Sequence, residues 1–323
     1  MDEFELVAQY FSQGRVQAGV RTGIGDDGAV LEGVPGQDIV VVTDTLVAGV
    51  HFATEHSAGD IGHKALAVNL SDIAAMGASA GWALLNLTLP RADTVWLENF
   101  SGALLELADR FAVALIGGDT TRGPLSISVT VGGWVPSGQA LTRQGASTGE
   151  DIYISGTLGE AAAALTLGLD CQQQLTLLEG ELFHRLARPE PRVDLGIVLR
   201  TLATAAIDIS DGLLADLGHV LAASGQLGAS ITAEALPLSP AACKLLGKEA
   251  ALSHALTGGD DFELCFTAPP ERRLAVATLA RSSGLTLTCI GTVTPGGGVT
   301  VSQGGAPHVA VESGYRHHWQ ADG

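Results

Sequence analysis

The stretch GIGDDGAV at residues 23–30 places two neighbouring carboxylates, Asp26 and Asp27, on a turn flanked by glycines. Glycine tolerates positive φ and lets other groups approach the backbone, so such a turn can bend carboxylates toward one ligand. Two anions held this close favour a bound cation, and we expect a metal ion. The alternative interpretation is that both aspartates only cap a turn, which suits Asp next to Gly in any protein.

Length and composition indicate two globular domains in an acidic protein. The chain has 323 residues, of which 46% are hydrophobic, and its net charge is -18. A length near 300 residues favours two domains of about 150 residues each. Because a strongly acidic surface repels nucleic acid and anionic lipid, we expect neither nucleic-acid nor membrane partners. An anionic substrate would then need a cation to bind.

The N-terminus and the cysteines predict the cellular location. Residues 1–5 are acidic where a secretory signal would be basic, and no run reaches the ~18 to 20 apolar residues of a membrane span. The four cysteines are scattered without a Cys-x-x-Cys pair, which indicates reduced thiols rather than a zinc site or a redox dithiol. We therefore expect a cytoplasmic protein.

The first half of the chain alternates helical and strand patterns, as in an α/β domain. Apolar side chains at helical spacing predict helices, and β-branched runs or strict alternation predict strands. The predicted helices are residues 3–11, 61–76 and 94–110, and the predicted strands are residues 38–42, 112–116 and 125–131. Polar residues follow two of these strands: Thr43 and Asp44 after the first, Gly118 and Asp119 after the second. Strand ends are well placed for chemistry, although Asp is also common there as a turn cap.

The predicted helix at residues 61–76 is apolar nearly all round and should be buried. It carries Asn69 and Asp72 on one face, three residues apart. A carboxylate on a buried helix costs several kcal/mol unless it is paired, hydrogen-bonded or bound to a metal. These two residues therefore indicate a site, and the alternative is a structural hydrogen bond to a loop.

Turn-forming residues at 142–150 predict a linker between an N-terminal domain, residues 1–141, and a C-terminal domain, residues 151–323. Arg143 in this linker could hold a phosphate through two parallel hydrogen bonds, or it is a solvated charge. The second half shows the same style of pattern as the first. Its predicted strands are residues 151–154, 205–209, 264–267, 285–290 and 299–301, and its predicted helices are residues 160–169, 192–202 and 211–223.

Asp208 and Asp211 lie three residues apart where a predicted strand meets a predicted helix. Ser210 or Asp211 is expected near the helix N-cap. A helix N-terminus favours anions while the two carboxylates can hold a cation, which suits a metal-bound phosphate. Further on, GGDDFE at residues 258–263 repeats the GGD of residues 117–119 and suggests two related halves.

The carboxylates thus gather at Gly-rich turns and predicted strand ends in both halves. Hard oxygen ligands select Mg²⁺, which bridges carboxylates to substrate phosphates. The only Gly-Lys pair, Gly247-Lys248, is followed by Glu249, so the Walker motif is missing. The protein-kinase motifs are missing too. The sequence therefore predicts Mg²⁺-dependent phosphate chemistry outside the common nucleotide-binding classes.

Five motifs span almost the whole chain: GIGDD at 23–27, TDTLVAGVHF at 43–52, KALAVNLSDIAAMGA at 64–78, GGDTTRGP at 117–124 and IDISDGL at 207–213. In this order they resemble the thiamine-monophosphate kinase family of the aminoimidazole-ribonucleotide synthetase superfamily. The resemblance implies an α/β (α+β) fold with an N-terminal domain that dimerises through its sheet and a C-terminal domain with helices packed on a mixed sheet. It also implies the phosphorylation of thiamine monophosphate by ATP to thiamine diphosphate, the last step of that biosynthesis, in a homodimer.

The same resemblance implies roles for individual residues. The Mg²⁺ ligands, for several ions, would be Asp27, Thr43, Asp44, Asp72, Asp119, Asp208 and Asp211. The contacts to ATP would be Gly118, Asp119, Arg143 and Ser210. The contacts to thiamine monophosphate would be His51, Asp260 and Tyr315. The family usually has Glu at the position of Asp260, and Trp319 is an alternative to Tyr315.

We expect direct in-line phosphoryl transfer without a phosphoenzyme, with Asp72, Asp119 and Arg143 as the catalytic residues. The acceptor is a phosphate monoester with a second pKa of about 6, so it is already anionic at neutral pH and needs no general base. The alternatives are another ATP-using enzyme of the same superfamily, or a non-catalytic sensor of Mg²⁺-nucleotide.

Overall fold

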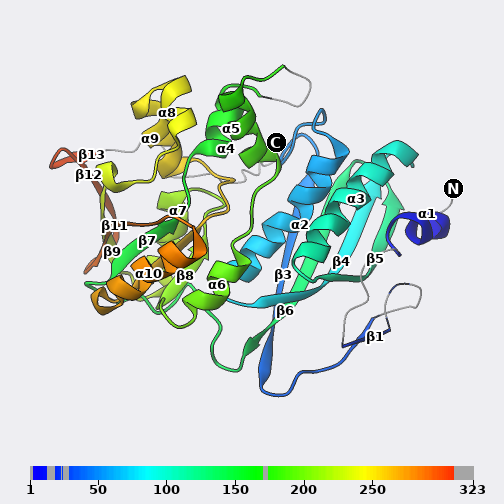
Figure 1. The fold of residues 1–323 in the computed structure, drawn as a ribbon, viewed down its shortest axis with the longest axis horizontal. Helices are drawn as coiled ribbons and strands as arrows, with labels where there is room; N and C mark the ends of the chain where they lie inside the picture. Colours follow the sequence, from blue (N-terminus) through cyan, green and yellow to red (C-terminus); the bar gives the residue numbers. More distant parts are fainter. Residues whose placement is uncertain (1–2, 13–18, 23, 25–28, 170–173, 309–323) are drawn as a thin grey trace, which may run out of the picture. The chain divides into compact units, whose positions relative to one another are not determined.

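The structure is a computed structural model that describes residues 3–12, 19–22, 24, 29–169 and 174–308 (Figure 1). Asp26, Asp27, Tyr315 and Trp319 lie outside the described residues. The chain forms two compact units: the first takes residues up to Ala140 together with Ala187–Val198, and the second takes Leu141–Leu169, Leu175–Leu186 and the chain from Leu199 onward. The predicted linker at residues 142–150 stays a prediction. Within the described ranges, no helix is long and apolar enough to cross a membrane.

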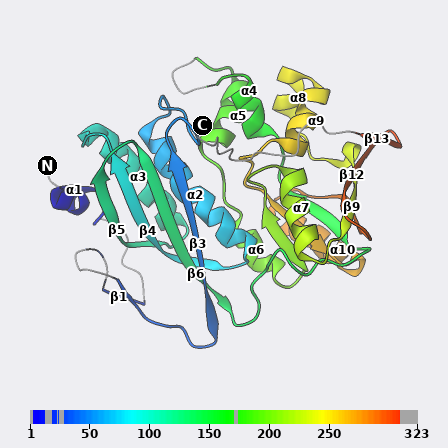
Figure 2. The ribbon, with the colours of Figure 1, turned by 180° about the vertical axis from the view of Figure 1, so that it is seen from behind.

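The first unit is a four-stranded sheet with helices on one face (Figures 1 and 2). Its strands, in spatial order, are β3 (Gln37–Val47), β6 (Ser126–Pro136), β4 (Ser79–Leu89) and β5 (Ala114–Arg122). The pairs β3·β6 and β6·β4 are antiparallel, and β4·β5 is parallel. The helices of this unit are α1 (Glu3–Tyr10), α2 (Ala58–Ala75), α3 (Thr94–Arg110) and α6 (Val193–Leu199). A short antiparallel pair, β1 (Val20–Thr22) and β2 (Val30–Leu31), completes it.

Alternation along the strands decides which side chains face the helices. On β3, Val40 and Leu46 are buried on the side against which α2 packs. The opposite side carries Ile39, Val41 and Thr45, which are exposed. We call this side of the sheet the helix-free face, and Figure 2 views the sheet from there.

Helix α2 is nearly all apolar, as its sequence predicted, because it is covered on several sides. It packs on β3, β4, β6 and α3. Its first turn is capped by Ser57, whose Oγ accepts a hydrogen bond from the Asp60 amide at 3.1 Å. The backbone of α6 also approaches it closely, since a Cβ on Gly196 would lie 2.0 Å from the Ala74 carbonyl oxygen.

Two strands run further than their sequence patterns predicted. Strand β3 was expected to end at residue 42, but it pairs with β6 residue by residue as far as Val47. Strand β5 likewise continues through Gly118 and Asp119 to Arg122. The expectation that Thr43, Asp44, Gly118 and Asp119 follow strand ends is therefore wrong, because pairing with a long neighbour keeps each residue inside its strand.

The second unit is a mixed seven-stranded sheet with helices packed on it. In spatial order the strands are β13 (Ala306–His308), β12 (Gly298–Gln303), β9 (Gly228–Thr232), β11 (Leu287–Thr294), β7 (Asp151–Ser155), β10 (Leu264–Ala268) and β8 (Ala205–Asp208). Only the β12·β9 pair of this sheet is parallel among the described strands. The helices are α4 (Glu160–Thr166), α5 (Leu177–Ala187), α7 (Leu213–Ala223), α8 (Pro240–Leu246), α9 (Lys248–Thr257) and α10 (Arg273–Ser283), with short 3₁₀ turns η1 (Ala233–Ala235) and η2 (Pro270–Arg272). The predicted fold class, with helices on a mixed sheet in this part, is confirmed.

The core of the second unit lies between the sheet and helices α7 and α9. Ile154 and Ile207 from the sheet pack with Leu217 of α7 and Leu256 of α9, and all four side chains are almost fully buried. A second cluster joins α4, α5, α8 and α9. These two clusters fix the ends of β7, β8 and α4, where the polar residues described next are placed.

Candidate functional site

In the first unit the structure brings Asp44 and Asp72 together. Asp44 lies on β3 on the side that faces α2, and Asp72 lies on α2 itself; both are half-buried. Burial raises the pKa of Asp44, and this is opposed by a hydrogen bond with the Asp72 side chain and by the charge of His51. Two carboxyl groups in hydrogen-bonding contact must share a proton or a cation. The pair is therefore a chemically reasonable place for a hard divalent cation.

His51 follows β3 and has a defined tautomer. Its Nδ1 accepts a hydrogen bond from the Val47 amide at 3.0 Å, so in the neutral ring the proton is on Nε2. The carbonyl of His51 accepts a hydrogen bond from Nζ of Lys64 at 3.3 Å, and Lys64 is 2% exposed. Nε2 is therefore the donor nitrogen of the neutral ring, and the His51 backbone is fixed by Lys64. Lys64 was not assigned a role from the sequence, and the signal was a lysine inside an otherwise apolar helix.

Thr43 and Asp119 lie on the other side of this sheet. The Thr43 hydroxyl is 2.9 Å from the hydroxyl of Thr130 on the helix-free face. Asp119 is paired with Asn86 in the β4·β5 register, and Asn86 is paired with Ser128, which places both side chains on that same face. Strands β3 and β5 are the two edges of the sheet, about 14 Å apart at a spacing of about 4.8 Å per strand. The structure therefore does not gather Thr43, Asp119 and the Asp44–Asp72 pair at one point.

Gly118 is the position on β5 where only glycine fits. Its φ is +143°, and a Cβ there would lie 1.8 Å from the carbonyl oxygen of Leu85 on the neighbouring strand. The missing Cβ makes room for the backbone of β4, and residues 118 and 119 are both exposed. The contact of Gly118 with a nucleotide stays a prediction.

In the second unit, Asp208 ends β8, and Ser210 and Asp211 form the turn into α7. As expected, Ser210 and Asp211 lie next to the helix N-cap, which is Gly212, and no side chain caps the helix from there. The amides of residues 210, 211 and 212 instead donate to Oδ2 of Asp216, at 3.1, 3.0 and 3.0 Å. These amides, which we expected to bind an anion, are already occupied by the chain's own carboxylate.

Asp216 is a residue that the sequence patterns missed. It is 3% exposed, and burial together with the charge of Asp208 raises its pKa to about 7. The signal was an acidic residue between Leu213 and Leu217 on the buried side of α7. Its effect is to hold the turn that carries Asp208, Ser210 and Asp211 against the start of the helix.

The Gly258–Glu263 loop packs directly on the turn that follows β8. The amide of Asp260 donates to the carbonyl of Ser210 at 2.9 Å, and the amide of Phe262 donates to Ile209 at 2.8 Å. Gly259 is needed here because a Cβ would lie 2.4 Å from the Ser210 carbonyl oxygen. The predicted substrate residue Asp260 is therefore beside the predicted ATP contact Ser210.

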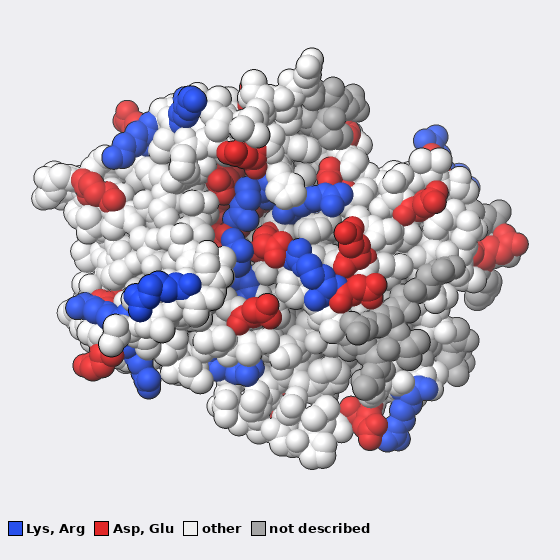
Figure 3. Space-filling view, in the orientation of Figure 1, with Lys and Arg blue, Asp and Glu red and all other residues white. Residues whose placement is uncertain are grey.

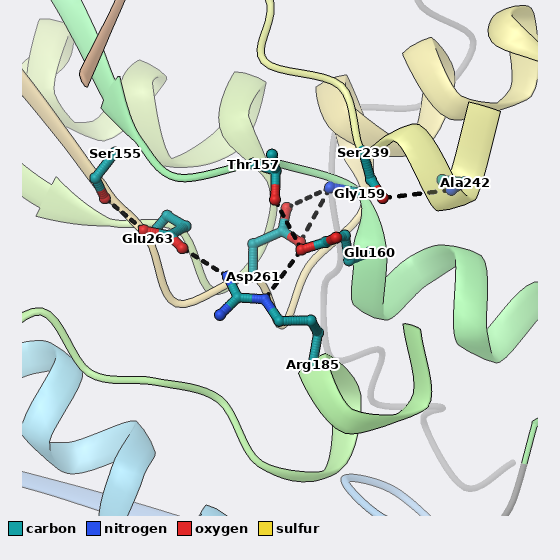
Figure 4. A network of polar contacts seen from close by, with 9 residues as sticks. All are labelled: Ser155, Thr157, Gly159, Glu160, Arg185, Ser239, Ala242, Asp261 and Glu263. Atoms are coloured by element: carbon teal, nitrogen blue, oxygen red, sulfur yellow. Dashed lines mark hydrogen bonds and ion pairs between the residues drawn. The ribbon is translucent and has the colours of Figure 1, made fainter. Parts of the chain in front are cut away.

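A buried network of charged side chains supports this loop (Figure 4). Arg185 lies between two carboxylates: its Nε is 3.0 Å from Glu160 and its guanidinium is 2.6 Å from Oε1 of Glu263. Oε2 of Glu263 accepts a hydrogen bond from Ser155 Oγ at 2.5 Å. Asp261 accepts hydrogen bonds from the amide of Gly159. Sequence patterns gave no role to Ser155, Glu160, Arg185 or Glu263, and counted Asp261 only among the carboxylates at Gly-rich turns.

Arg143 lies on the segment that leads to β7, and its side chain is exposed. Its carbonyl accepts a hydrogen bond from Ser224 Oγ at 3.2 Å, which ties the segment to the end of α7. The face drawn in Figure 3 mixes basic and acidic side chains and shows no continuous basic patch. Among the described residues, no three His, Cys, Asp or Glu side chains form a group that could hold a metal ion.

The chain matches two family models in order along its length. Residues 25–135 match the N-terminal domain of AIR synthase related protein, and residues 147–303 match its C-terminal domain. It is 46% identical to the thiamine-monophosphate kinase of Escherichia coli (strain K12) over 321 residues, 98% of either chain.

Solved structures agree with these matches. The thiamine-monophosphate kinase of Stenotrophomonas maltophilia K279a is 48% identical and superposes with a TM-score of 0.88, covering 95% of this chain and 98% of its own. AaThiL complexed with AMPPCP and TMP is 33% identical, with a TM-score of 0.79 over 98% and 97% of the two chains. Because relatives at this identity are matched over nearly their full length, the chain belongs to the thiamine-monophosphate kinase family.

Proposed function

We propose that this chain transfers the γ-phosphoryl group of ATP to thiamine monophosphate, giving ADP and thiamine diphosphate. The observation that carries the proposal is the 46% identity to a curated thiamine-monophosphate kinase over 98% of both chains. A related enzyme, AaThiL, is known in complex with AMPPCP and TMP, a nucleotide analogue and a phosphate compound in one structure.

Several side chains would hold Mg²⁺. In the first unit the Asp44–Asp72 pair fits the ion by its donor chemistry, since two adjacent carboxyl groups with oxygen donors only are what Mg²⁺ prefers. In the second unit we assign the role to Asp208 and Asp211. Asp27, Thr43 and Asp119 complete the proposed ligand set, and the Thr43 hydroxyl is the least favourable of these because it bonds to Thr130. When bound, Mg²⁺ supplies neutralisation of the phosphate charges.

The ATP contacts we propose are Gly118, Asp119, Arg143 and Ser210. Gly118 is exposed on β5, and the exposed Arg143 guanidinium can hold two phosphate oxygens at once. Ser210 is held in place by the bond from its amide to Asp216. These groups would orient the γ-phosphate for in-line attack, and Asp72, Asp119 and Arg143 would be the catalytic residues.

For the acceptor we propose His51, Asp260 and Tyr315, with Tyr315 outside the described residues. His51 would donate to the acceptor from Nε2–H, because Nδ1 accepts the hydrogen bond from the Val47 amide. The attacking atom is a phosphate oxygen that is anionic at neutral pH, since the second pKa of a phosphate monoester is about 6. The transfer therefore needs alignment and charge neutralisation and no phosphoenzyme.

We also propose that the protein is a homodimer formed through the helix-free face and the β3 edge. Ile39 and Val41 on this face are 59% and 56% exposed, which is unusual for β-branched side chains. Strand β3 is an eleven-residue edge that contains no proline and no lysine, the residues that normally protect an edge. The cytoplasmic location stays a prediction.

The test is the release of ADP from Mg²⁺-ATP by the full chain, measured with and without thiamine monophosphate. We expect release that depends on the acceptor and that matches the thiamine diphosphate formed. Nucleotide binding without acceptor-dependent release would favour a Mg²⁺-nucleotide sensor. Turnover with a different acceptor would favour another ATP-using enzyme of the superfamily.

A further inference from the structure

The loop that carries Asp260 has an unusual backbone. Asp260 has φ +65° and Phe262 has φ +49°, both in the left-handed region that side chains other than glycine rarely adopt. A residue in this conformation is strained and persists only where the surroundings fix it. Residues with such strained backbones are concentrated at binding and catalytic sites, and contacts from the surrounding structure hold them in place.

Backbone hydrogen bonds fix the outer side of the loop. The amides of Asp260 and Phe262 donate to Ser210 and Ile209, and the Ile209 amide donates back to the carbonyl of Glu263. These bonds extend the β8·β10 pairing beyond the ends of the strands. Asp261 lies between the two left-handed residues, and its side chain rather than its backbone makes the bonds that hold it.

Asp261 is buried and only 5% exposed. Its Oδ1 and Oδ2 lie 3.0 and 2.8 Å from the amide nitrogen of Gly159, the residue that precedes α4 (Figure 4). Gly159 is itself left-handed, with φ +82°, and a Cβ on it would lie 2.7 Å from the Ala255 amide nitrogen. The middle of the loop is thus attached to a fixed point at the start of a helix.

Glu263 anchors the end of the same loop. Its carboxylate is 0% exposed and is bonded to Ser155 and Arg185. Gly156 is required beside it, since a Cβ at that position would lie 2.2 Å from Oε1 of Glu263. With both Asp261 and Glu263 attached, the peptide between Asp260 and Phe262 has no freedom to relax to ordinary φ values.

We propose that Asp261 is a positioning residue for substrate binding: by bonding to Gly159 it keeps Asp260 in the left-handed conformation that presents the Asp260 carboxylate to thiamine monophosphate. The inference rests on the proposed function through the assignment of Asp260. Asp261 itself is buried and touches no substrate. Its contribution should therefore appear only through Asp260.

The experiment is a double-mutant cycle on the full chain. KM for thiamine monophosphate and KM for ATP are measured for Asp261→Ala, Asp261→Asn, Asp260→Ala and the Asp260→Ala/Asp261→Ala double variant. We expect Asp261→Ala to raise KM for thiamine monophosphate about tenfold, the equivalent of one released strained residue, with KM for ATP changed less than about twofold. Asp261→Asn keeps one acceptor oxygen, so its KM for thiamine monophosphate should lie between those of wild type and Asp261→Ala. In the Asp260→Ala background, Asp261→Ala should add nothing.

The matched control is Asp151→Asn. Asp151 is another buried carboxylate of this unit, 1% exposed and bonded to Arg273 at 2.6 and 2.7 Å, but it pairs with Ala268 at the far end of β10. Asp151→Asn should lower the stability of the protein in urea without changing the ratio of KM for thiamine monophosphate to KM for ATP. If the Ala variant does not fold, Asp261→Asn gives the same comparison.

Two results would overturn the proposal. One is an equal rise of both KM values in Asp261→Ala, and the other is an Asp261→Ala effect that persists undiminished in the Asp260→Ala background. A different result would overturn the proposed role of Asp260 instead: an Asp260→Ala variant with unchanged KM for thiamine monophosphate. Loss of acceptor-dependent ADP release in the unmodified chain would overturn the proposed function itself.

Discussion

In the first unit, two carboxylates from different elements are in contact: Asp44 on strand β3 and Asp72 on helix α2. Like charges in contact repel, and burial makes the repulsion larger. The residues that follow Asp72 on α2, Ile73 and Ala74, are fully buried and apolar. The Mg²⁺ ion proposed above would neutralise both carboxylates of the pair.

Asp72→Asn should weaken the use of Mg²⁺. The variant keeps one oxygen donor but loses the charge, so we expect the Mg²⁺ concentration for half-maximal activity to rise about tenfold, or about 1.4 kcal/mol, with a lower kcat. Titration of activity with Mg²⁺ at saturating ATP and acceptor measures this. Asp60→Asn is the control on the same helix, since Asp60 bonds to Arg188. Near-normal turnover and an unchanged Mg²⁺ requirement in Asp72→Asn would contradict its metal role.

His51 allows a substitution that separates fold from binding. In His51→Asn the side-chain oxygen can take the place of Nδ1 and accept the Val47 amide, while the Nε2 donor is lost. We expect KM for thiamine monophosphate to rise about tenfold at unchanged KM for ATP. His51→Gln, which restores a donor near the position of Nε2, should recover part of the loss. Steady-state kinetics on both variants measures this. A KM for thiamine monophosphate equal to that of wild type in both variants would show that His51 does not bind the substrate.

At the scale of elements, the turn that leads into helix α7 is fixed by the carboxylate of Asp216, a residue in the first turn of the same helix. Asp216 accepts the amides of Ser210, Asp211 and Gly212, of which only Gly212, the N-cap residue, belongs to the helix end. Asp216 therefore joins the turn after β8 to the first turn of α7. The same device makes the Asp208–Asp211 turn a rigid part of the fold.

Asp216→Ala should destabilise the protein by about 2–4 kcal/mol, because three buried amides lose their acceptor. Asp216→Asn keeps an acceptor oxygen and should lose less than half of that. Urea unfolding gives both values. Acceptor-dependent turnover should fall in the same order, since Asp208 and Asp211 would no longer be fixed. An Ala variant as stable as the wild type would show that other groups hold the turn.

Strand β7 carries a pH-dependent ion pair at its start. The bond to Arg273 lowers the pKa of Asp151 below its ordinary value of about 3.9, so the folded state binds the proton less readily than the unfolded chain. The pair therefore contributes stability above the unfolded-state pKa and loses it as pH falls through the folded-state pKa. Asp151→Asn should be less stable than wild type by about 1–3 kcal/mol at pH 7, with a difference that shrinks below pH 4. Urea midpoints across this range test it, and a difference independent of pH would contradict it.

Sequence patterns predicted some of the helices and strands and missed others, for physical reasons. Helix α3 was predicted over its observed range because its apolar spacing repeats over four turns. Strand β4, the inner strand beside β5 and β6, was missed, since SAGWALLNLTL has few β-branched residues and owes its conformation to its two neighbours. Asp72 was selected as a candidate site residue from the sequence because an acidic residue is unusual in an apolar helix.

Other site features depend on contacts between distant parts of the chain. Asp216 reads as an ordinary acid in the first turn of a helix, and the left-handed backbone of Asp260 and Phe262 has no local signal. The bond from Asp261 to Gly159 joins positions 102 residues apart. Only the folded structure reveals such partners, because no short pattern encodes them.

At the scale of the whole molecule, the first unit covers only one side of its sheet with helices. The β1·β2 pair packs through Val20 and Leu31 against Trp82 and protects one end of the other side. The rest carries Ile39 and Val41 beside a row of hydroxyl groups. A second copy of the chain could cover this surface, as the family resemblance implies.

Val41→Lys should therefore produce a monomer. A lysine in the middle of the proposed contact would bury an unpaired charge in each subunit, which costs several kcal/mol. Leu274→Lys on α10 is the control, since Leu274 is 76% exposed on the second unit. Light scattering after gel filtration gives the mass: we expect a dimer for wild type and the control, and a monomer for Val41→Lys. A monomeric wild type would rule out the dimer.

The segment Ala187–Val198, which belongs to the first unit, has a consequence for the order of synthesis. Arg188 bonds to Asp60, the Pro189 carbonyl bonds to His63, and Glu190 bonds to Arg110, so this segment secures α2 and α3. A chain made from the N-terminus must therefore wait for residues well into its second half before α2 is fully covered. On the ribosome, the first unit would start to fold first but finish late, with its apolar helix partly bare in between.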